Sequence, residues 1–274
     1  MTTSFRVERI ILAIALALGA SAARPVQPLC AQAPASPGAK NWTERRRDIE
    51  EYLRTAEVVK MEQIGVGVTA PRRAHTAPGG PVDSFTWKPI APGRYRGFQE
   101  SYKSEIAAYE LDKALALDMF PPAVERRLDG DLGAAVMWVS PAKSFKQLGG
   151  VPTPPPTQLE RWNRQIVRAK MIDNLIANTD PNLGNWLVDP AWNVVLIDHS
   201  RAFTSTRKMT HEMTRIDAGL WERMQALDRN GLVAALGSWL STDEIEALLG
   251  RRDKMKSIVN ALVAKRGADA VFIR

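Results

Sequence analysis

The segment NTDPNLGNWLVDPAWNVVLIDHSRAF, residues 178–203, decides the fold of this chain. In it, Asn185 follows Asp180 by five residues, and Asp198 follows Asn185 by thirteen. The apolar runs on either side of residues 190–193 predict a β-hairpin whose second strand ends at Asp198. Carboxylate and amide oxygens are ligands that hard divalent cations prefer. The spacing therefore indicates a site for a metal-bound triphosphate.

Each of these three residues also has a purely structural interpretation. Asp180 could be a turn or cap residue before a proline, Asn185 a turn residue after a glycine, and Asp198 a cap at the end of a strand. Asn182 is a rival to Asn185 as the metal ligand. The spacing of the whole set favours a functional site over three separate turns.

The composition predicts a globular protein. The chain has 274 residues, of which 45% are hydrophobic and 24% charged, enough for one two-lobed domain or two small ones. Its formal net charge of +7 suits nucleic acid, an anionic membrane or a phosphorylated ligand. Because no zinc-finger, RRM-like or basic-zipper pattern accompanies the charge, nucleic-acid binding is not expected. No Walker A string, G-x-S-x-G elbow or zinc-ligand spacing is present either.

The N-terminus has the pattern of a secretory signal. Arg6 and Arg9 precede the apolar run Ile10–Leu18, and Ala20-Ser21-Ala22 offers an A-x-A cleavage site. The apolar run is shorter than the roughly 20 residues that a membrane-spanning helix needs. We therefore predict that residues 1–22 are a signal peptide and that the body is exported, to the periplasm or outside the cell. An uncleaved segment would instead tether the body to the membrane.

Residues 23–40 are rich in proline, alanine and serine, which predicts a flexible leader. Cys30, the only cysteine, lies within it, so no intrachain disulfide can form. We interpret Cys30 as an inert thiol, with a lipidated cysteine as the alternative.

From residue 41 the sequence becomes periodic. Residues 43–53 predict an amphipathic helix with a capping Asn or Thr, and strands are predicted at 56–64 and 84–89. Gly65 and Gly67 lie between these strands, where glycines let backbone N–H groups approach phosphates closely. Taken alone, this G-x-G favours an ordinary hairpin.

A lysine and a glutamate follow in an order that carries chemistry. Lys88 ends the second predicted strand, and Glu105 begins a helix predicted over residues 104–115, with a glycine-containing loop at 91–97 between them. A strand lysine paired with a helix glutamate is the arrangement that holds nucleotide phosphates in phosphoryl-transfer sites. The alternatives are a solvated surface lysine and a carboxylate favoured by the helix dipole.

The remaining pattern divides the chain into a β-rich and a helical half. Residues 123–128 and 133–140 predict a hairpin that turns at Asp129-Gly130. The proline-rich residues 148–157 mark a boundary, and residues 158–178 predict a long apolar-striped helix that leads into the Asp180 loop. Beyond residue 210 we expect three or four helices, including 217–227, 232–240 and 243–250.

These motifs together resemble the atypical kinases that include the HipA-type toxin kinases, the phosphatidylinositol 3- and 4-kinases and the secreted Golgi casein kinases. The resemblance covers roughly residues 58–205 and rests on IGVGVTAP, TWKP, SEIAAYELDKALALDMFPPAVERRLDGDLGAAVMWV, DNLIANTDPNLGNWLVD and VVLIDHSRAF. It implies ATP and Mg²⁺ or Mn²⁺ as cofactors. The implied roles are Asp180 as catalytic base, Asn185 and Asp198 as metal ligands, Lys88 on the α- and β-phosphates, Glu105 as its partner, Gly65 and Gly67 over the nucleotide, and Trp138, Val139 and Ser140 as the hinge beside the adenine.

The chain departs from these families at three places. Thr179 stands where a His or Arg would precede the base, and Pro181-Asn182 replace the Arg-His that follows it in the lipid kinases. After Asp198, His199-Ser200 replace the Phe-Gly of a D-F-G motif. We interpret His199 as a packed residue behind the site. These differences bear on the acceptor and on activation more than on the nucleotide chemistry.

The resemblance implies an α+β, two-lobed protein-kinase-like fold. We predict a small β-rich N-lobe with one main helix at 41–140, a hinge and proline-rich linker at 141–157, and a helical C-lobe at 158–274. The predicted function is transfer of the γ-phosphoryl group of ATP to a hydroxyl of a protein, lipid or small molecule. The alternative is a nucleotide-binding pseudokinase or scaffold without turnover.

Overall fold

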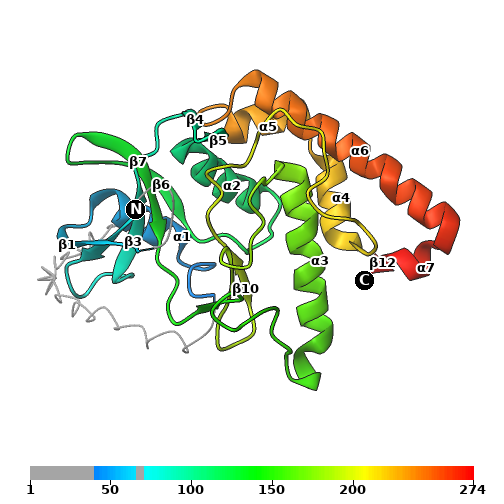
Figure 1. Cartoon of the computed structure of the whole chain (residues 1–274), viewed down its shortest axis with the longest axis horizontal. Helices are drawn as coiled ribbons and strands as arrows, with labels where there is room; N and C mark the ends of the chain where they lie inside the picture. The colour runs from blue at the N-terminus through cyan, green and yellow to red at the C-terminus, as the bar shows by residue number, and fades with distance from the viewer. Residues whose placement is uncertain (1–39, 66–70) are drawn as a thin grey trace, which may run out of the picture. The chain divides into compact units, whose positions relative to one another are not determined.

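Five antiparallel strands form the main sheet of the first half of the chain (Figure 1). We describe it from a computed structural model that covers residues 40–65 and 71–274. The order across the sheet is β1-β2-β3-β7-β6, with bounds β1 Val58–Gln63, β2 Arg72–Thr76, β3 Ser84–Lys88, β6 Ala123–Leu128 and β7 Asp131–Met137. Because β3 pairs with β2 on one side and β7 on the other, Lys88 at its end is fixed by a central strand.

The hairpin of β6 and β7 turns where the sequence predicts it. Asp129 and Gly130 both have positive φ angles, 51° and 90°, as a tight two-residue hairpin turn requires. Farther along β7, Gly133 faces the end of β3. A Cβ atom at residue 133 would lie 2.7 Å from the carbonyl oxygen of Lys88 and 2.7 Å from the Cα of Pro89. Glycine is therefore needed here for the close approach of the two strands.

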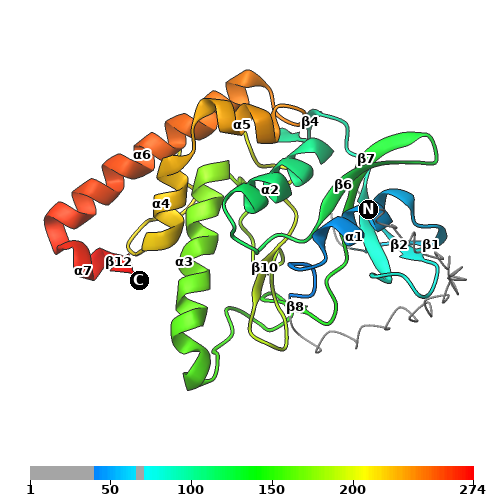
Figure 2. The same ribbon diagram turned by 180° about the vertical axis from the view of Figure 1, so that it is seen from behind.

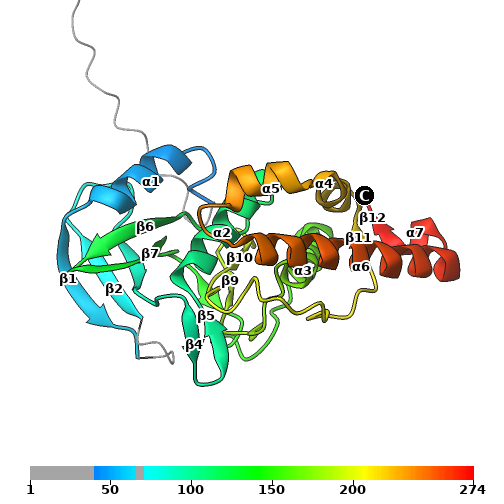
Figure 3. The same cartoon turned by 90° about the horizontal axis from the view of Figure 1, so that it is seen from above.

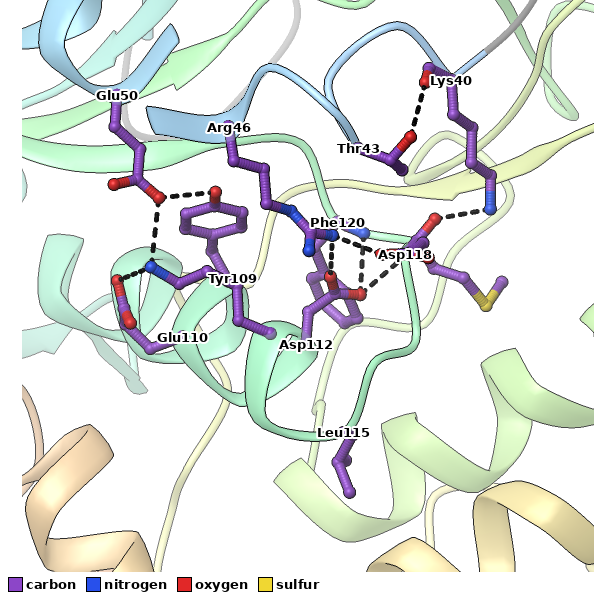
Figure 4. A network of polar contacts seen from close by, with 12 residues as sticks. Lys40, Thr43, Arg46, Glu50, Tyr109, Glu110, Asp112, Leu115, Asp118 and Phe120 are labelled. Atoms are coloured by element: carbon purple, nitrogen blue, oxygen red, sulfur yellow. Dashed lines mark hydrogen bonds and ion pairs between the residues drawn. The ribbon is translucent and has the colours of Figure 1, made fainter. Parts of the chain in front are cut away.

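Two helices pack on β6 and β7, α1 at Arg46–Thr55 and α2 at Tyr102–Ala114. Polar contacts join them, as Figure 4 shows. Arg46 forms ion pairs with Asp112, at 3.3 Å, and with Asp118. Tyr109 donates a hydrogen bond to Glu50 at 2.7 Å. These contacts fix α2, the helix that carries Glu105.

The second half of the chain is mainly helical (Figures 1 and 2). Its helices are α3 Leu159–Ile176, α4 Ala218–Ala226, α5 Arg229–Leu236, α6 Thr242–Arg266 and α7 Ala268–Val271, after the short 3₁₀ turn η1 Pro156–Gln158. A small sheet in the order β10-β9-β8 consists of β8 Lys143–Ser144, β9 Trp186–Val188 and β10 Val194–Leu196. β11 Ile216–Asp217 and β12 Phe272–Ile273 form a parallel pair. The predicted hairpin before Asp198 is thus present as β9 and β10.

The interior of the described part of the chain contains two hydrophobic clusters. The smaller one lies between α1 and one face of the main sheet and includes Trp42, Phe85 and Trp87. The larger one runs from α2 into the helical half and includes Ile106 and Leu175. Seen from above in Figure 3, α2 lies between the main sheet and the helices. Helix α2 therefore shares its core with both halves and couples them.

Several elements differ from the sequence-based expectation. Strand β2 was not predicted, because its sequence RRAHT buries only Ala74 and Thr76. The predicted loop at 91–97 includes most of a short hairpin, β4 Gly93–Tyr95 and β5 Phe98–Glu100. Helix α1 begins at Arg46 and has no side-chain cap. Helix α6 continues past Gly250 to Arg266, because Met255 and Val259 pack into the core.

The N-terminal predictions lie outside the described residues. These are the signal peptide at 1–22, and nearly all of the leader at 23–40, including Cys30. Within the described part of the chain, no helix has the length and hydropathy to cross a membrane.

Candidate active site

The predicted lysine and glutamate form a buried ion pair. The Nζ atom of Lys88 lies 2.6 Å from Oε1 of Glu105, and the two side chains are 8% and 3% exposed. Glu105 lies in the first turn of α2. Ser101 caps the start of this helix, because its hydroxyl accepts a hydrogen bond from the amide of Lys103. The end of the central strand and the start of a capped helix thus fix both partners.

Asp198 joins this pair from the far half of the chain. One of its carboxylate oxygens lies 2.7 Å from Nζ of Lys88, and its side chain is 44% exposed. The amide of the next residue, His199, donates to Oε2 of Glu105 at 3.0 Å. Asp198 itself has a φ of +62°, a conformation that Asp and Asn adopt more readily than most residues. The backbone after β10 turns here so that the carboxylate faces Lys88.

His199 lies behind the site, as the sequence analysis expects. Its side chain is buried, and its ring lies 4.4 Å from the ring of Phe120. Burial lowers the pKa of His199 to about 4, so its imidazole is neutral at pH 7.

The charges of Lys88, Glu105 and Asp198 shift one another's pKa values. Burial alone would lower the pKa of Lys88, but the carboxylates of Asp198 and Glu105 outweigh it and raise that pKa. Burial opposes ionisation of Asp198, yet the ammonium of Lys88 prevails and lowers the pKa of Asp198. Burial, together with the charge of Asp198, raises the pKa of Glu105 against the pull of Lys88. One cation thus faces two carboxyl groups, an arrangement that favours a further positive charge beside Asp198.

Asp180 lies in the loop that follows α3. Its amide donates to Oδ1 of Asn178 at 3.0 Å, and its carboxylate accepts from Asn182 at 2.9 Å and from Arg201 at 3.2 Å. The side chain is 35% exposed. Asp180 is therefore both oriented and reachable, as a group that accepts a proton must be.

Asn185 connects this loop to Asp198. Its side-chain NH₂ group donates to the main-chain carbonyl oxygen of Asp180 at 3.1 Å. Its main-chain carbonyl oxygen accepts a hydrogen bond from the amide of Ile197 at 3.0 Å. Asn185 is therefore hydrogen-bonded to the residue directly before Asp198. Because the NH₂ end of its side chain is occupied, the amide oxygen is the end that remains for a cation.

The residues present fit a divalent cation held by few protein ligands. No group of three or more His, Cys, Asp or Glu side chains placed to bind a metal occurs within residues 40–65 and 71–274. Lys88 and Ser200 both contact Oδ1 of Asp198, so its other carboxylate oxygen can bind a cation. Asn185 can supply its side-chain amide oxygen. A cation bound through one carboxylate plus substrate phosphates is the usual mode for Mg²⁺. The rival ligand Asn182 has both ends of its amide engaged, by Asp180 and by the amide of Gly184.

The other predicted nucleotide contacts are placed only in part. Gly65 follows β1, and a Cβ there would meet open space, whereas Gly67 lies outside the described residues. These glycines precede β2 rather than the strand that carries Lys88. In the predicted hinge, the amide of Trp138 already donates to Ser84 at 3.1 Å. The main-chain N–H and C=O groups of Val139 and Ser140 form no hydrogen bond with another main-chain group in the described part of the chain.

Two polar features of the site were missed by the sequence analysis. Arg201 contacts Asp180, and a buried group at the end of α3 supports the loop. In that group Asp173 accepts from Asn178 at 2.9 Å and shares a hydrogen bond with His211, also at 2.9 Å. The signal for this group was Asp173-Asn174, a polar pair inside an apolar stretch of helix. No local pattern marks Arg201, because its partners are distant in sequence.

No family model and no curated protein matches the chain. Solved structures do. A Golgi casein kinase with manganese and ADP bound has a TM-score of 0.60 at 14% identity, covering 83% of this chain and 78% of that one. A Fam20 protein of hydra, solved with sugar, has a TM-score of 0.61 at 15% identity, covering 82% and 91%. The proinflammatory kinase CtkA of Helicobacter pylori has a TM-score of 0.50 at 11% identity, covering 79% and 98%.

At these identities the comparisons establish the fold. They agree with the arrangement derived from the chain, a sheet and its helix joined to a helical half, with Lys88, Glu105 and Asp198 meeting where the halves join. The predicted α+β fold class is confirmed. The chain has the two-lobed fold of the atypical kinases.

Proposed function

We propose that this protein is an ATP-dependent phosphotransferase that moves the γ-phosphoryl group to a hydroxyl group of a protein, lipid or small molecule. The observation that carries the proposal is the contact of Lys88 with both Glu105, at 2.6 Å, and Asp198, at 2.7 Å. A scaffold would gain little from this cluster, because burying the charges of Lys88 and Glu105 without a ligand is costly.

Each residue has a positional or electrostatic role in the proposed reaction. Lys88, held by Glu105, stabilises negative charge that develops on the phosphates. Asp180 orients the acceptor hydroxyl and accepts its proton. Asp198 and the amide oxygen of Asn185 hold a divalent cation, which when bound neutralises phosphate charge. The hinge main chain at Val139 and Ser140 contacts the adenine.

The cofactors proposed are ATP and Mn²⁺ or Mg²⁺. A similar structure that holds manganese and ADP supports this pair. The partners are therefore a nucleotide and a hydroxyl-bearing acceptor, and no role is proposed for nucleic acid.

The test is transfer of labelled phosphate from γ-labelled ATP by the purified protein, with Mn²⁺ and dephosphorylated casein as a trial acceptor. We expect incorporation into the protein itself or into casein, and its loss in Asp198→Asn and in Asp180→Asn. Equal incorporation by all three proteins would refute the assignment. Thermal shift with ATP and Mn²⁺ runs in parallel. A metal-dependent shift without turnover would identify a nucleotide-binding scaffold, and no shift would exclude both functions.

We further propose that the protein acts outside the cytoplasm, on the basis of the signal-like residues 1–22 alone. Sequencing the N-terminus of the exported product tests this. A new terminus at Ala23 is expected after cleavage, an intact Met1 on membrane-bound protein would indicate a tether, and protein confined to the cytoplasm would contradict the proposal.

A further inference from the structure

Arg201 bridges two carboxylates that come from opposite halves of the chain. Its Nη1 atom lies 3.2 Å from Oδ2 of Asp180, in the loop after α3. Its Nε and Nη2 atoms each lie 2.9 Å from Oε1 of Glu100, at the end of β5. The guanidinium also lies 4.3 Å from the ring centroid of Phe98, within the range of a cation–π contact. Arg201 is thus held on three sides.

Glu100 makes this bridge hard to replace. Its side chain is 1% exposed, and Oε2 has no hydrogen-bond partner among the described residues. Within residues 40–65 and 71–274, the guanidinium of Arg201 is the only cation that pairs with this carboxylate. A buried carboxylate that loses its cation is strongly destabilised. The ion pair with buried Glu100 therefore fixes the position of the Arg201 guanidinium.

The bridge also restricts Asp180. Asn182 holds the other carboxylate oxygen of Asp180 at 2.9 Å, so each oxygen has one fixed donor. Thr179 adds a second link, because its hydroxyl donates to the carbonyl oxygen of Arg201 at 3.0 Å. Each carboxylate oxygen can still accept one more hydrogen bond. The carboxylate is therefore confined in direction while it remains able to bind a hydroxyl.

We propose that Arg201 is a positioning residue: it fixes the direction of the Asp180 carboxylate and ties it, through Glu100, to the β4–β5 hairpin. The role is indirect, because the guanidinium acts through Asp180. The proposal rests on the proposed function, since it gives Asp180 the task of orienting the acceptor. It adds that the hairpin, which carries the exposed aromatic residues Tyr95 and Phe98, moves together with the base.

The test must separate positioning from folding. Arg201→Gln alone leaves Glu100 buried without a cation, so the main variant is the double substitution Glu100→Gln with Arg201→Gln, which removes both charges. Its matched control is Arg94→Gln, an exposed residue on the same hairpin. We expect the double variant to fold, to bind ATP and Mn²⁺ within about twofold of the wild-type affinity, and to show a kcat about 10- to 100-fold lower. Arg94→Gln should match the wild type in both measurements.

Two further measurements decide the outcome. In an Asp180→Asn background, the added pair of substitutions should lower the residual kcat by less than about twofold, because its target is gone. An equal loss in both backgrounds, or an unchanged kcat in the double variant, would overturn the proposal. A loss of nucleotide affinity equal to the loss of kcat would overturn it as well.

The contact can also be tested without turnover. The unfolding equilibrium constant can be measured in a double-mutant cycle of Arg201→Gln and Asp180→Asn, made in the Glu100→Gln background. The effect of the two substitutions together should differ from the product of their separate effects by at least about twofold. Strict additivity would overturn the positioning role whether or not the protein transfers phosphate. If the wild type binds nucleotide but transfers no phosphate, the proposed function fails, and this cycle alone decides whether Arg201 holds Asp180.

Discussion

The two parts of the candidate site are held in different ways. Lys88 lies 17 residues from Glu105 and 110 residues from Asp198 along the chain, and it forms an ion pair with each. The side chains of Lys88 and Glu105 are deeply buried, whereas that of Asp198 is partly exposed. Asp180 and Asn185 belong to one loop and are held mainly by hydrogen bonds to residues within five positions of them. The first part depends on the whole fold, whereas the second depends on local turns and on Arg201.

This difference separates stability from chemistry. Substitution of Lys88 or Glu105 should change both the free energy of unfolding and the rate, because a buried charge loses its partner. Substitution of Asp180, whose side chain is 35% exposed, should change the rate and leave the fold nearly intact. The predictions below test this contrast in order of their expected effect on phosphate transfer.

The largest effect is expected for Lys88→Met. Removal of the ammonium leaves Glu105 and Asp198 facing each other, so the protein should lose about 3–5 kcal/mol of stability and about 10²- to 10³-fold in kcat. Denaturant unfolding and γ-labelled ATP transfer measure the two losses. The control is Lys256→Met, an exposed residue of α6, which should leave both unchanged. An unaltered unfolding midpoint in Lys88→Met would contradict the buried ion pairs.

Asp180→Asn should affect the rate alone. We expect kcat to fall about 10²-fold or more, while the free energy of unfolding changes by less than about 1 kcal/mol, because the side chain is 35% exposed. The same two assays apply, with Asp83→Asn, a solvent-exposed Asp before β3, as the control. A stability loss as large as that of Lys88→Met would erase the contrast between the two parts.

Asn185→Ala sharpens the choice of metal ligand. The concentration of Mn²⁺ needed for half-maximal transfer should rise about tenfold, because the amide oxygen proposed as a metal ligand is lost. Asn182→Ala should leave that concentration unchanged, since both ends of its amide already bind within the loop. A larger shift in Asn182→Ala than in Asn185→Ala would exchange the two assignments. Titration of Mn²⁺ at saturating ATP gives both values.

The smallest effect on transfer, and a clear effect of pH, is expected for Asp112→Asn. Burial raises the pKa of Asp112 to about 7, against the opposing pull of the Met119 amide and Arg46. The folded state therefore binds more protons than the unfolded state between about pH 4 and 7, and stability from this group is lost as pH rises through that range.

In the wild type, the ionisation of Asp112 should lower the free energy of unfolding by up to about 4 kcal/mol as the pH rises through this range. Asp112→Asn should remove this decrease and leave kcat unchanged. Glu110→Gln, a partly exposed neighbour on α2, should keep the wild-type profile. Identical profiles for wild type and Asp112→Asn would show that Asp112 is ionised at neutral pH in the folded protein.

The sequence predicted the parts of the molecule that local patterns encode. The turn at Asp129-Gly130 needs residues that tolerate positive φ, and the apolar runs around residues 190–193 mark β9 and β10. The order of Lys88, Glu105 and Asp198 indicated their meeting, and the structure brings the three together. Their roles, with those of Asp180 and Asn185, stay predictions until activity is measured.

What the sequence did not predict depends on distant contacts. The sequence of β2 is not typical of a strand, and it is extended because it pairs with β1 on one side and β3 on the other. Arg201 lies close to Asp198 in sequence, but its partner Glu100 is 101 residues away. Helix α6 passes Gly250 because tertiary packing outweighs the cost of about 1 kcal/mol for a glycine inside a helix. In each case the deciding interaction is non-local.

Gly133 has a consequence for any search through variants of this protein. A methyl group there would press on the backbone at Lys88 and Pro89 and push apart the two strands that hold the lysine. A deep mutational scan that selects only for folded protein should therefore return glycine at this position. Such a result would look like the signature of a catalytic residue, although close packing against the backbone of Lys88 and Pro89 is enough to explain it.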